Sequence, residues 1–130
     1  GEYTDFLWYY GESDLPATEG YWVLKNQPSV PTDLLRIDWH RNLSNQTSYI
    51  KYTNVVPGGA ENGGYISHEV TQSNNYDRYY EIFNKGKNET TYIEWNSDTK
   101  EGRVKNELYF GDNNWRCWDS QLVNTECQWT

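Results

Sequence analysis

Apolar and polar residues alternate along most of this 130-residue chain. The clearest example is the segment from Leu35 to His40, in which Leu35, Ile37 and Trp39 alternate with polar residues. A β-strand places successive side chains on opposite faces, so a period of two predicts strands with one buried face. No segment shows a convincing helical period. The predicted strands are residues 21–24, 35–40, 47–56, 65–71, 76–84, 90–96, 103–109 and 115–118, with a strand or a short helical turn at 3–10.

Two hairpins of similar sequence lie 43 residues apart. Asn45–Tyr52 aligns with Asn88–Trp95, and Ile37–Trp39 in the preceding strand aligns with Tyr80–Ile82. Each unit has an alternating strand, a polar turn with Asn and a Thr-rich alternating strand, which predicts a β-hairpin used twice. The apolar positions on one face of the strands are expected to form the core. They are Leu35, Ile37, Trp39, Ile50, Tyr52, Ile66, Val70, Tyr80, Ile82, Ile93, Trp95 and Val104.

Turn signals separate the predicted strands at short intervals. Residues 57–64 are the richest of these segments, and Asn62–Gly63 suits the positive φ angles of a tight hairpin turn. We therefore predict a single all-β domain over residues 1–130, an antiparallel barrel or sandwich of eight to nine strands built from repeated hairpins. Within it, residues 1–33 are expected to be an irregular segment with short strands, and residues 34–130 the hairpin core.

Aromatic residues are unusually frequent in this chain. The 12 Tyr, 7 Trp and 3 Phe together outnumber the 20 Ile, Leu and Val residues. Most rings are expected to pack in the core and on strand faces, because aliphatic residues are scarce. Each Tyr or Trp also carries a polar group that needs a partner or water, so some rings should reach the surface, where they can bind a ligand.

The chain is acidic, with a net charge of −8 and a pI near 4.6. Nucleic acids and anionic membrane surfaces repel such a protein, and its Lys and Arg residues form no basic stripe. No run of apolar residues is long enough to predict a membrane-spanning helix. The charge favours a neutral polar ligand such as a glycan, or a cation. We expect no nucleic acid partner and no membrane insertion of this segment. The sequence indicates no oligomeric state.

The two cysteines, Cys117 and Cys127, are ten residues apart near the C-terminus. No His or further Cys lies nearby at the spacing of zinc ligands. The cysteines are therefore either two buried free thiols or one disulfide that closes a terminal loop. The disulfide is favoured if the protein is exported.

Two tryptophans and an Asx-rich turn beside the cysteines form the candidate ligand site. Trp115 and Trp118 provide flat rings that can stack on sugars, and Asp112, Asn113 and Asn114 can bind hydroxyl groups. The alternative is a tryptophan plug that packs on the cysteines. Residues three apart in a strand point to opposite faces, so both rings can serve one site only if Trp115 lies in the turn.

Catalytic and metal-binding patterns are weak. His40 is out of phase with the core and should face solvent, whereas His68 shares the core face. No nucleophile-elbow motif occurs. Asp38 and Glu81 occupy equivalent positions of the repeat and are expected to be solubilising charges rather than a glycosidase pair. The Asx-rich turns match no EF-hand spacing. We therefore expect no catalytic residue, no metal and no cofactor.

Several short segments carry a resemblance to a known group of domains. They are Lys51–Gly59, Ile82–Gly86, Ile93–Asn96, Gly102–Lys105, Phe110–Asp112, Trp115–Asp119 and Cys127. This series resembles uncharacterised secreted or lipoprotein β domains of Bacteroidetes-type bacteria over about residues 37–127. The resemblance implies a secreted or cell-surface location and, with it, a Cys117–Cys127 disulfide. It implies no activity and no active-site residue.

The leading functional prediction is an exported, non-enzymatic binding module for a neutral glycan. The alternative is a lipocalin-like barrel that holds a small apolar or aromatic ligand, and a small glycoside hydrolase is the third reading. A row of surface rings would favour the glycan module, an interior cavity the lipocalin-like barrel, and a cleft between two carboxylates the hydrolase.

Overall fold

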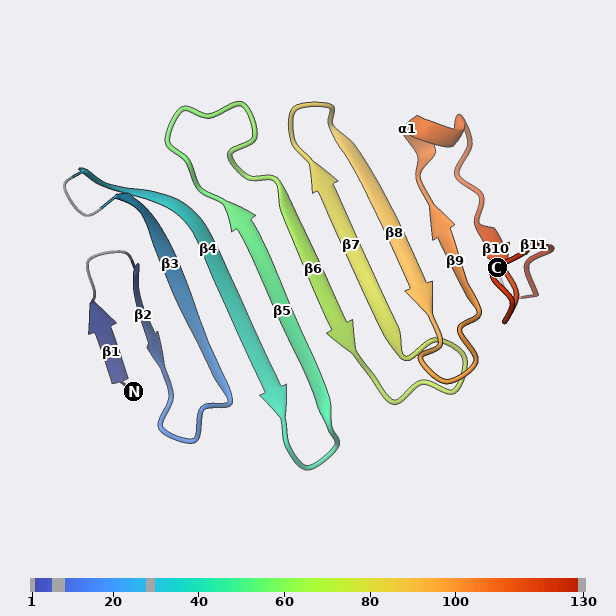
Figure 1. The fold of residues 1–130 in the computed structure, drawn as a ribbon, viewed down its shortest axis with the longest axis horizontal. Coiled ribbons are helices and arrows are strands. Elements are labelled where there is room, and N and C mark those ends of the chain that lie inside the picture. Colours follow the sequence, from blue (N-terminus) through green and yellow to red (C-terminus); the bar gives the residue numbers. More distant parts are fainter. Residues whose placement is uncertain (1, 6–8, 28–29, 129–130) are drawn as a thin grey trace.

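The computed structural model describes residues 2–5, 9–27 and 30–128. These residues form eleven β-strands in one antiparallel sheet, which follow one another across the sheet in chain order, and one short helix (Figure 1). The elements are β1 (Glu2–Asp5), β2 (Tyr9–Ser13), β3 (Glu19–Gln27), β4 (Val30–Asn42), β5 (Thr47–Asn54), β6 (Tyr65–Val70), β7 (Arg78–Asn84), β8 (Glu89–Trp95), β9 (Gly102–Lys105), α1 (Glu107–Phe110), β10 (Arg116–Trp118) and β11 (Asn124–Thr125). The prediction of an all-β fold built from hairpins is confirmed.

The sheet is a single open layer. Each described strand pairs with the strands before and after it in the sequence, and β1 and β11 lie at opposite edges (Figure 1). The predicted barrel or sandwich of eight to nine strands is therefore not confirmed. Alternation shows that the two faces of a strand differ, but it carries no information about closure or about a second layer.

The N-terminal segment, predicted to be irregular with short strands, contains β1, β2, the nine-residue β3 and the start of β4. β3 pairs with β4 along most of its length, with register shifts around Lys25. Of the element predicted at residues 3–10, residues 6–8 lie outside the described part of the chain. The remaining residues belong to β1 and β2, which pair antiparallel.

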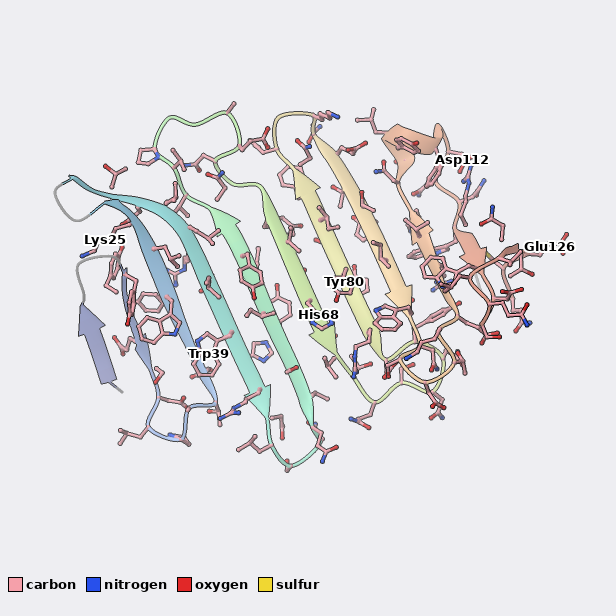
Figure 2. All side chains as sticks on the ribbon, viewed as in Figure 1. Lys25, Trp39, His68, Tyr80, Asp112 and Glu126 are labelled. Carbon is pink, nitrogen blue, oxygen red and sulfur yellow. A yellow bond between two sulfur atoms is a disulfide. The ribbon has the colours of Figure 1, made fainter. Side chains whose placement is uncertain are left out.

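The strand register gives the sheet two different faces. Directly opposed residues of antiparallel strands share a face, and Ile37, Tyr52, Ile66 and Ile82 are opposed in turn from β4 to β7. All the predicted core residues lie on this face, so their predicted phase is confirmed. We call it the apolar face, and Figure 2 shows Trp39, His68 and Tyr80 over it. Its apolar, aromatic and histidine members are Tyr9, Trp22, Leu24, Leu35, Ile37, Trp39, Ile50, Tyr52, Ile66, His68, Val70, Tyr80, Ile82, Ile93, Trp95, Val104 and Trp118, and the charged residues Arg78 and Arg116 lie among them.

The apolar face is not buried within the chain. Among the side chains that the structure describes, the buried apolar ones are Val23 and Cys117, and neither belongs to the predicted core. Tyr52 is 39% exposed and Ile66 is 47% exposed. The prediction of a buried core at these positions is therefore wrong for the single chain, because one sheet without a second layer cannot cover its own face.

The sequence repeat corresponds to two hairpins of the same type. β4–β5 and β7–β8 each turn through four residues, between the pairs Asn42–Thr47 and Asn84–Glu89. The side-chain oxygens of Asn42 and Asn84 accept backbone N–H bonds from their turns. The last turn residue has positive φ in both, 58° at Gln46 and 52° at Asn88. The turns thus match at an offset of 42 residues and the apolar positions at 43.

The predicted strand at residues 103–109 ends early, at Lys105. Asn106 then caps α1, since its side-chain oxygen accepts a hydrogen bond from the Tyr109 amide at 2.9 Å. The same side chain donates to Thr91 Oγ1 at 2.8 Å, which holds the helix against β8. Gly111 ends the helix with a φ of 79°, a conformation that glycine adopts without strain.

Cys117 and Cys127 form a disulfide, as predicted, with 5.2 Å between their Cα atoms. Titration of the unfolded, unreduced protein with a thiol reagent should therefore find no free thiol. We expect the Cys117→Ser/Cys127→Ser variant to lose roughly 2–3 kcal/mol of unfolding free energy, because the crosslink restricts the unfolded chain. Urea denaturation of both proteins measures the difference, and equal midpoints would contradict the expectation.

Candidate binding surfaces on the polar face

The opposite side of the sheet, called the polar face below, combines tyrosines with charged residues. One cross-strand row runs through Glu12, Tyr21, Asp38 and Lys51 from β2 to β5. The sequence analysis did not identify these rings as ligand candidates. The available signal was that these tyrosines occupy the polar positions of the alternating strands. The polar face comprises Tyr10, Glu12, Glu19, Tyr21, Val23, Arg36, Asp38, His40, Tyr49, Lys51, Thr53, Tyr65, Ser67, Glu69, Tyr79, Glu81, Phe83, Thr90, Tyr92, Glu94, Arg103 and Lys105.

At the centre of the polar face, two tyrosines bind one carboxylate. Tyr79 donates to Glu81 Oε1 at 3.0 Å, and Tyr65 donates to Glu81 Oε2. The hydrogen bond to Glu81 and then burial raise the pKa of Tyr65 to about 12, and burial and then the same carboxylate raise the pKa of Tyr79. The Lys51 ammonium lies 4.2 Å from the centre of the Tyr65 ring. Glu81 is therefore part of a fixed network and not simply a solubilising charge.

A groove of about 370 Å³ lies at the end of the polar face where β2, β3, β4 and β5 run side by side. Two cross-strand rows bring its side chains together: Glu12, Tyr21 and Asp38 in one row, and Glu19, His40 and Tyr49 in the next. We call it the acidic groove. Its lining consists of Glu12, Ser13, Asp14, Glu19, Gly20, Tyr21, Asp38, Trp39, His40 and Tyr49.

The rings of the acidic groove are held by their neighbours. His40 and Tyr49 stack with 5.1 Å between ring centres and an interplanar angle of 15°. The Arg36 guanidinium lies 4.4 Å from the centre of the Tyr21 ring and also pairs with Asp38 at 3.0 Å. The groove thus presents oriented rings beside carboxylates. His40 is exposed on this side of the sheet, as predicted.

Asp14 organises the β2–β3 turn at the rim of the groove. Its Oδ1 accepts the Thr18 and Glu19 amides at 2.7 and 3.0 Å, and its Oδ2 accepts the Thr18 hydroxyl. The hydroxyl bond and then the Glu19 amide bond lower the pKa of Asp14. Asp14 is therefore committed to the turn, whereas Glu12 and Glu19 carry exposed carboxylates at the rim.

The structure does not bring the two predicted site tryptophans together. Trp115 precedes β10 and lies on the polar side, with the Arg103 guanidinium 4.1 Å and the Lys105 ammonium 4.6 Å from its ring centre. Trp118 is opposed to Gly102 on the apolar face, and its Nε1 donates to the Lys100 carbonyl at 2.8 Å. Trp115 thus lies outside the strand, but the two rings occupy opposite faces.

The predicted hydrogen-bonding turn is largely engaged within the chain. Asp112 forms a two-point pair with Arg116, with Oδ1 to Nη1 at 2.5 Å and Oδ2 to Nη2 at 2.8 Å. The Arg116 bond and then the Asn114 amide lower the pKa of Asp112 to about 2. The Asn114 carbonyl also accepts a hydrogen bond from Arg116 Nη1 at 3.2 Å. Asn113 is exposed and borders a groove of about 740 Å³ that is also lined by Tyr92 and Lys105.

His68 lies on the apolar face, as predicted. It is a titratable residue with a buried ring nitrogen that lacks a hydrogen-bond partner in the described part of the chain. Among the described residues, its buried Nε2 has no partner, and its ring stacks on Tyr80 at 4.4 Å between centres. Ile50 and Tyr80 flank it on the neighbouring strands, and Arg78 is the charged group that acts on it. Burial and then the Arg78 charge lower the pKa of His68 below its ordinary value of 6.5.

The lowered pKa of His68 predicts that the free energy of unfolding is smaller in mild acid. The unfolded state takes up the proton at a higher pH than the folded state, so unfolding becomes easier as the pH falls below about 6.5. Urea unfolding at about pH 7.5 and about pH 5.5 should show this loss in the wild type and in His40→Phe. In His68→Phe the part of the pH dependence due to His68 should disappear. An unchanged pH dependence in that variant would contradict the assignment.

Among residues 2–5, 9–27 and 30–128, no group of three or more His, Cys, Asp or Glu side chains is arranged to hold a metal ion. No helix in the described part of the chain is long and apolar enough to cross a membrane.

Comparison with known proteins gives no relative for this chain. No protein-family model matches it, and no curated protein or solved structure matches it. Its function is therefore inferred from its own surfaces.

Proposed function

We propose that this chain is an exported, non-enzymatic binding module for a neutral glycan, and that the acidic groove is its binding site. The observation that carries the proposal is the combination in one groove of Tyr21 and the stacked His40–Tyr49 pair with the carboxylates of Glu12 and Glu19. Sugars need both components, because their C–H faces pack on rings while their hydroxyl groups need hydrogen-bond partners.

The charge of the groove supports a neutral ligand. Carboxylates accept hydrogen bonds from hydroxyl groups but repel sulfated or uronic-acid sugars. The apolar face offers rings without such partners, so it fits a polar glycan poorly. The open sheet also provides no closed interior in the described part of the chain, so the lipocalin-like alternative has no support.

Export is part of the proposal. The Cys117–Cys127 disulfide suits an oxidising compartment. The resemblance to secreted and lipoprotein domains points the same way.

A glycan array followed by affinity gel electrophoresis tests the proposal. We expect wild-type protein to bind a neutral polysaccharide, and Tyr49→Ala to weaken binding by about tenfold or more, since truncating a central interface tyrosine typically costs over 1 kcal/mol. Tyr92→Ala is the matched control, because Tyr92 also lies on the polar face but lines the other groove. It should bind like the wild type.

Three outcomes would count against the acidic groove. Absence of binding by the wild type to every neutral glycan would remove the proposal. Binding lost in Tyr92→Ala but kept in Tyr49→Ala would move the site to the groove beside Asn113. Binding lost only in Trp115→Ala or Trp118→Ala would restore the site predicted from the sequence.

A further inference from the structure

The apolar face is a continuous uncovered surface. Within the described part of the chain, contacts between elements join adjacent strands, and the one helix lies against β8. No described helix or strand packs across the apolar face, and the turn at Lys100 covers only its end beside Trp95 and Trp118. Its central residues Tyr52 and Ile66 are among the most exposed large side chains of the sheet. Contiguous exposed apolar surface of this extent marks an interaction site in a soluble protein.

The centre of the apolar face carries no charged side chain. One row runs Trp22, Ile37, Tyr52, Ile66, Ile82 and Thr91, and the next runs Trp39, Ile50, His68, Tyr80, Ile93 and Val104. The charged residues of this face that lie nearest are outside these rows or at their end: Arg78 lies between Val70 and Trp95 in the next row, and Arg116 of β10 is opposed to Val104. A partner that depends on charge complementarity would find no charged group in the two central rows, whereas a second apolar sheet would find apolar side chains to pack against.

The accessible surface of the chain indicates how much area a partner could cover. The chain exposes 8634 Å², whereas a folded monomer of this mass is expected to expose about 7,200 Å². The excess is about 1,400 Å² per chain. Two chains that each covered this excess would bury about 2,900 Å², within the range of obligate homodimers.

We propose that two copies of this chain stack apolar face on apolar face to form a two-layer β-sandwich. A second copy fits because an isologous contact needs a surface that complements itself, and the two central rows of this face are apolar and uncharged from β3 to β9. Sheets packed in this way lie about 10 Å apart with their side chains interdigitated. The dimer leaves the polar face and its acidic groove open on both outer sides.

The association of the wild-type protein is the first test. Sedimentation equilibrium from about 1 to 100 μM should give twice the chain mass of 15.4 kDa. The thermal unfolding midpoint should rise with protein concentration over the same range, because folding and association are then coupled. A single-chain mass at about 100 μM with a concentration-independent midpoint would overturn the proposal.

Two adjacent residues of β5 provide a matched pair of variants. Tyr52 lies on the apolar face and Thr53 on the polar face, beside Arg36. Tyr52→Glu places a carboxylate in the interface and should give the single-chain mass, whereas Thr53→Glu adds the same charge and should remain a dimer. Far-UV circular dichroism checks that each variant keeps its strands.

Other occupants of the apolar face give different results. A dimer that survives in a folded Tyr52→Glu variant would place the contact elsewhere and contradict the proposal. Binding to neutral phosphatidylcholine vesicles by a protein that is monomeric without them would assign the face to a lipid surface instead. If Tyr52→Glu loses its strands, the concentration dependence of the wild-type midpoint decides the question alone.

Discussion

Replacing Gly102 with alanine is expected to lower the free energy of unfolding by about 3 kcal/mol, because the added methyl group has no room. Gly102 is buried in β9. A Cβ atom at this position would lie 2.3 Å from Trp118 Cζ2 and 2.6 Å from the backbone oxygen of Glu94. The Trp118 ring occupies the space that a side chain would need, which is a common reason for glycine inside a strand.

Urea denaturation and near-UV circular dichroism of Gly102→Ala measure both consequences. The unfolding midpoint should fall, and the aromatic signal should change as the Trp118 ring moves. The double variant Gly102→Ala/Trp118→Ala is the control. Its cost should be smaller than the sum of the two single variants, since removing the ring relieves one of the two clashes. Strict additivity would show that the ring does not occupy this space.

Strand phase could be predicted from the sequence because each residue contributes to it locally. Ile50 and Ile93 fell on the correct face because the alternation around them is regular. The hairpin turns could also be predicted from the sequence. The side chains of Asn42 and Asn84 accept backbone hydrogen bonds in these turns, as Asn commonly does in turns of this kind. These features depend on a few neighbouring residues, and the rest of the fold does not alter them.

The number of layers could not be predicted in the same way. A strand with one apolar face has the same pattern whether that face meets a second sheet of its own chain, a second copy or a ligand. Val23, the most buried of the apolar side chains described, lies on the polar face. It lies between the long side chains of Tyr10 and Arg36 on the neighbouring strands, a pairing that alternation does not reveal.

The candidate site was misplaced for a related reason. Trp115 and Trp118 are close in sequence, but β10 spans residues Arg116–Trp118, so their rings lie on opposite sides of the sheet. The acidic groove instead joins residues from β2 to β5, and Tyr21 and Tyr49 are 28 positions apart. Only the strand register brings them together, and register depends on the pairing of the whole sheet.

Replacing Ile93 with alanine is expected to lower the free energy of unfolding by roughly 2–4 kcal/mol, the cost of truncating a large aliphatic side chain in a packed core. Ile93 lies in β8 between Tyr80 and Val104, half-buried in the single sheet. In an open sheet, water would replace much of the lost contact, and the cost would be about 1 kcal/mol. The larger value follows from the proposed stacking of two chains, which would enclose this side chain.

Leu108→Ala is the control for this measurement. Leu108 lies on α1, borders the groove that Asn113 and Tyr92 also line, and is 58% exposed. Its truncation should change the stability by less than about 0.5 kcal/mol. Urea denaturation at about 50 μM, where the dimer should prevail, gives both values. A loss near 1 kcal/mol for Ile93→Ala would mean that water reaches the apolar face in solution. A loss no larger than that of Leu108→Ala would contradict the strand phase itself.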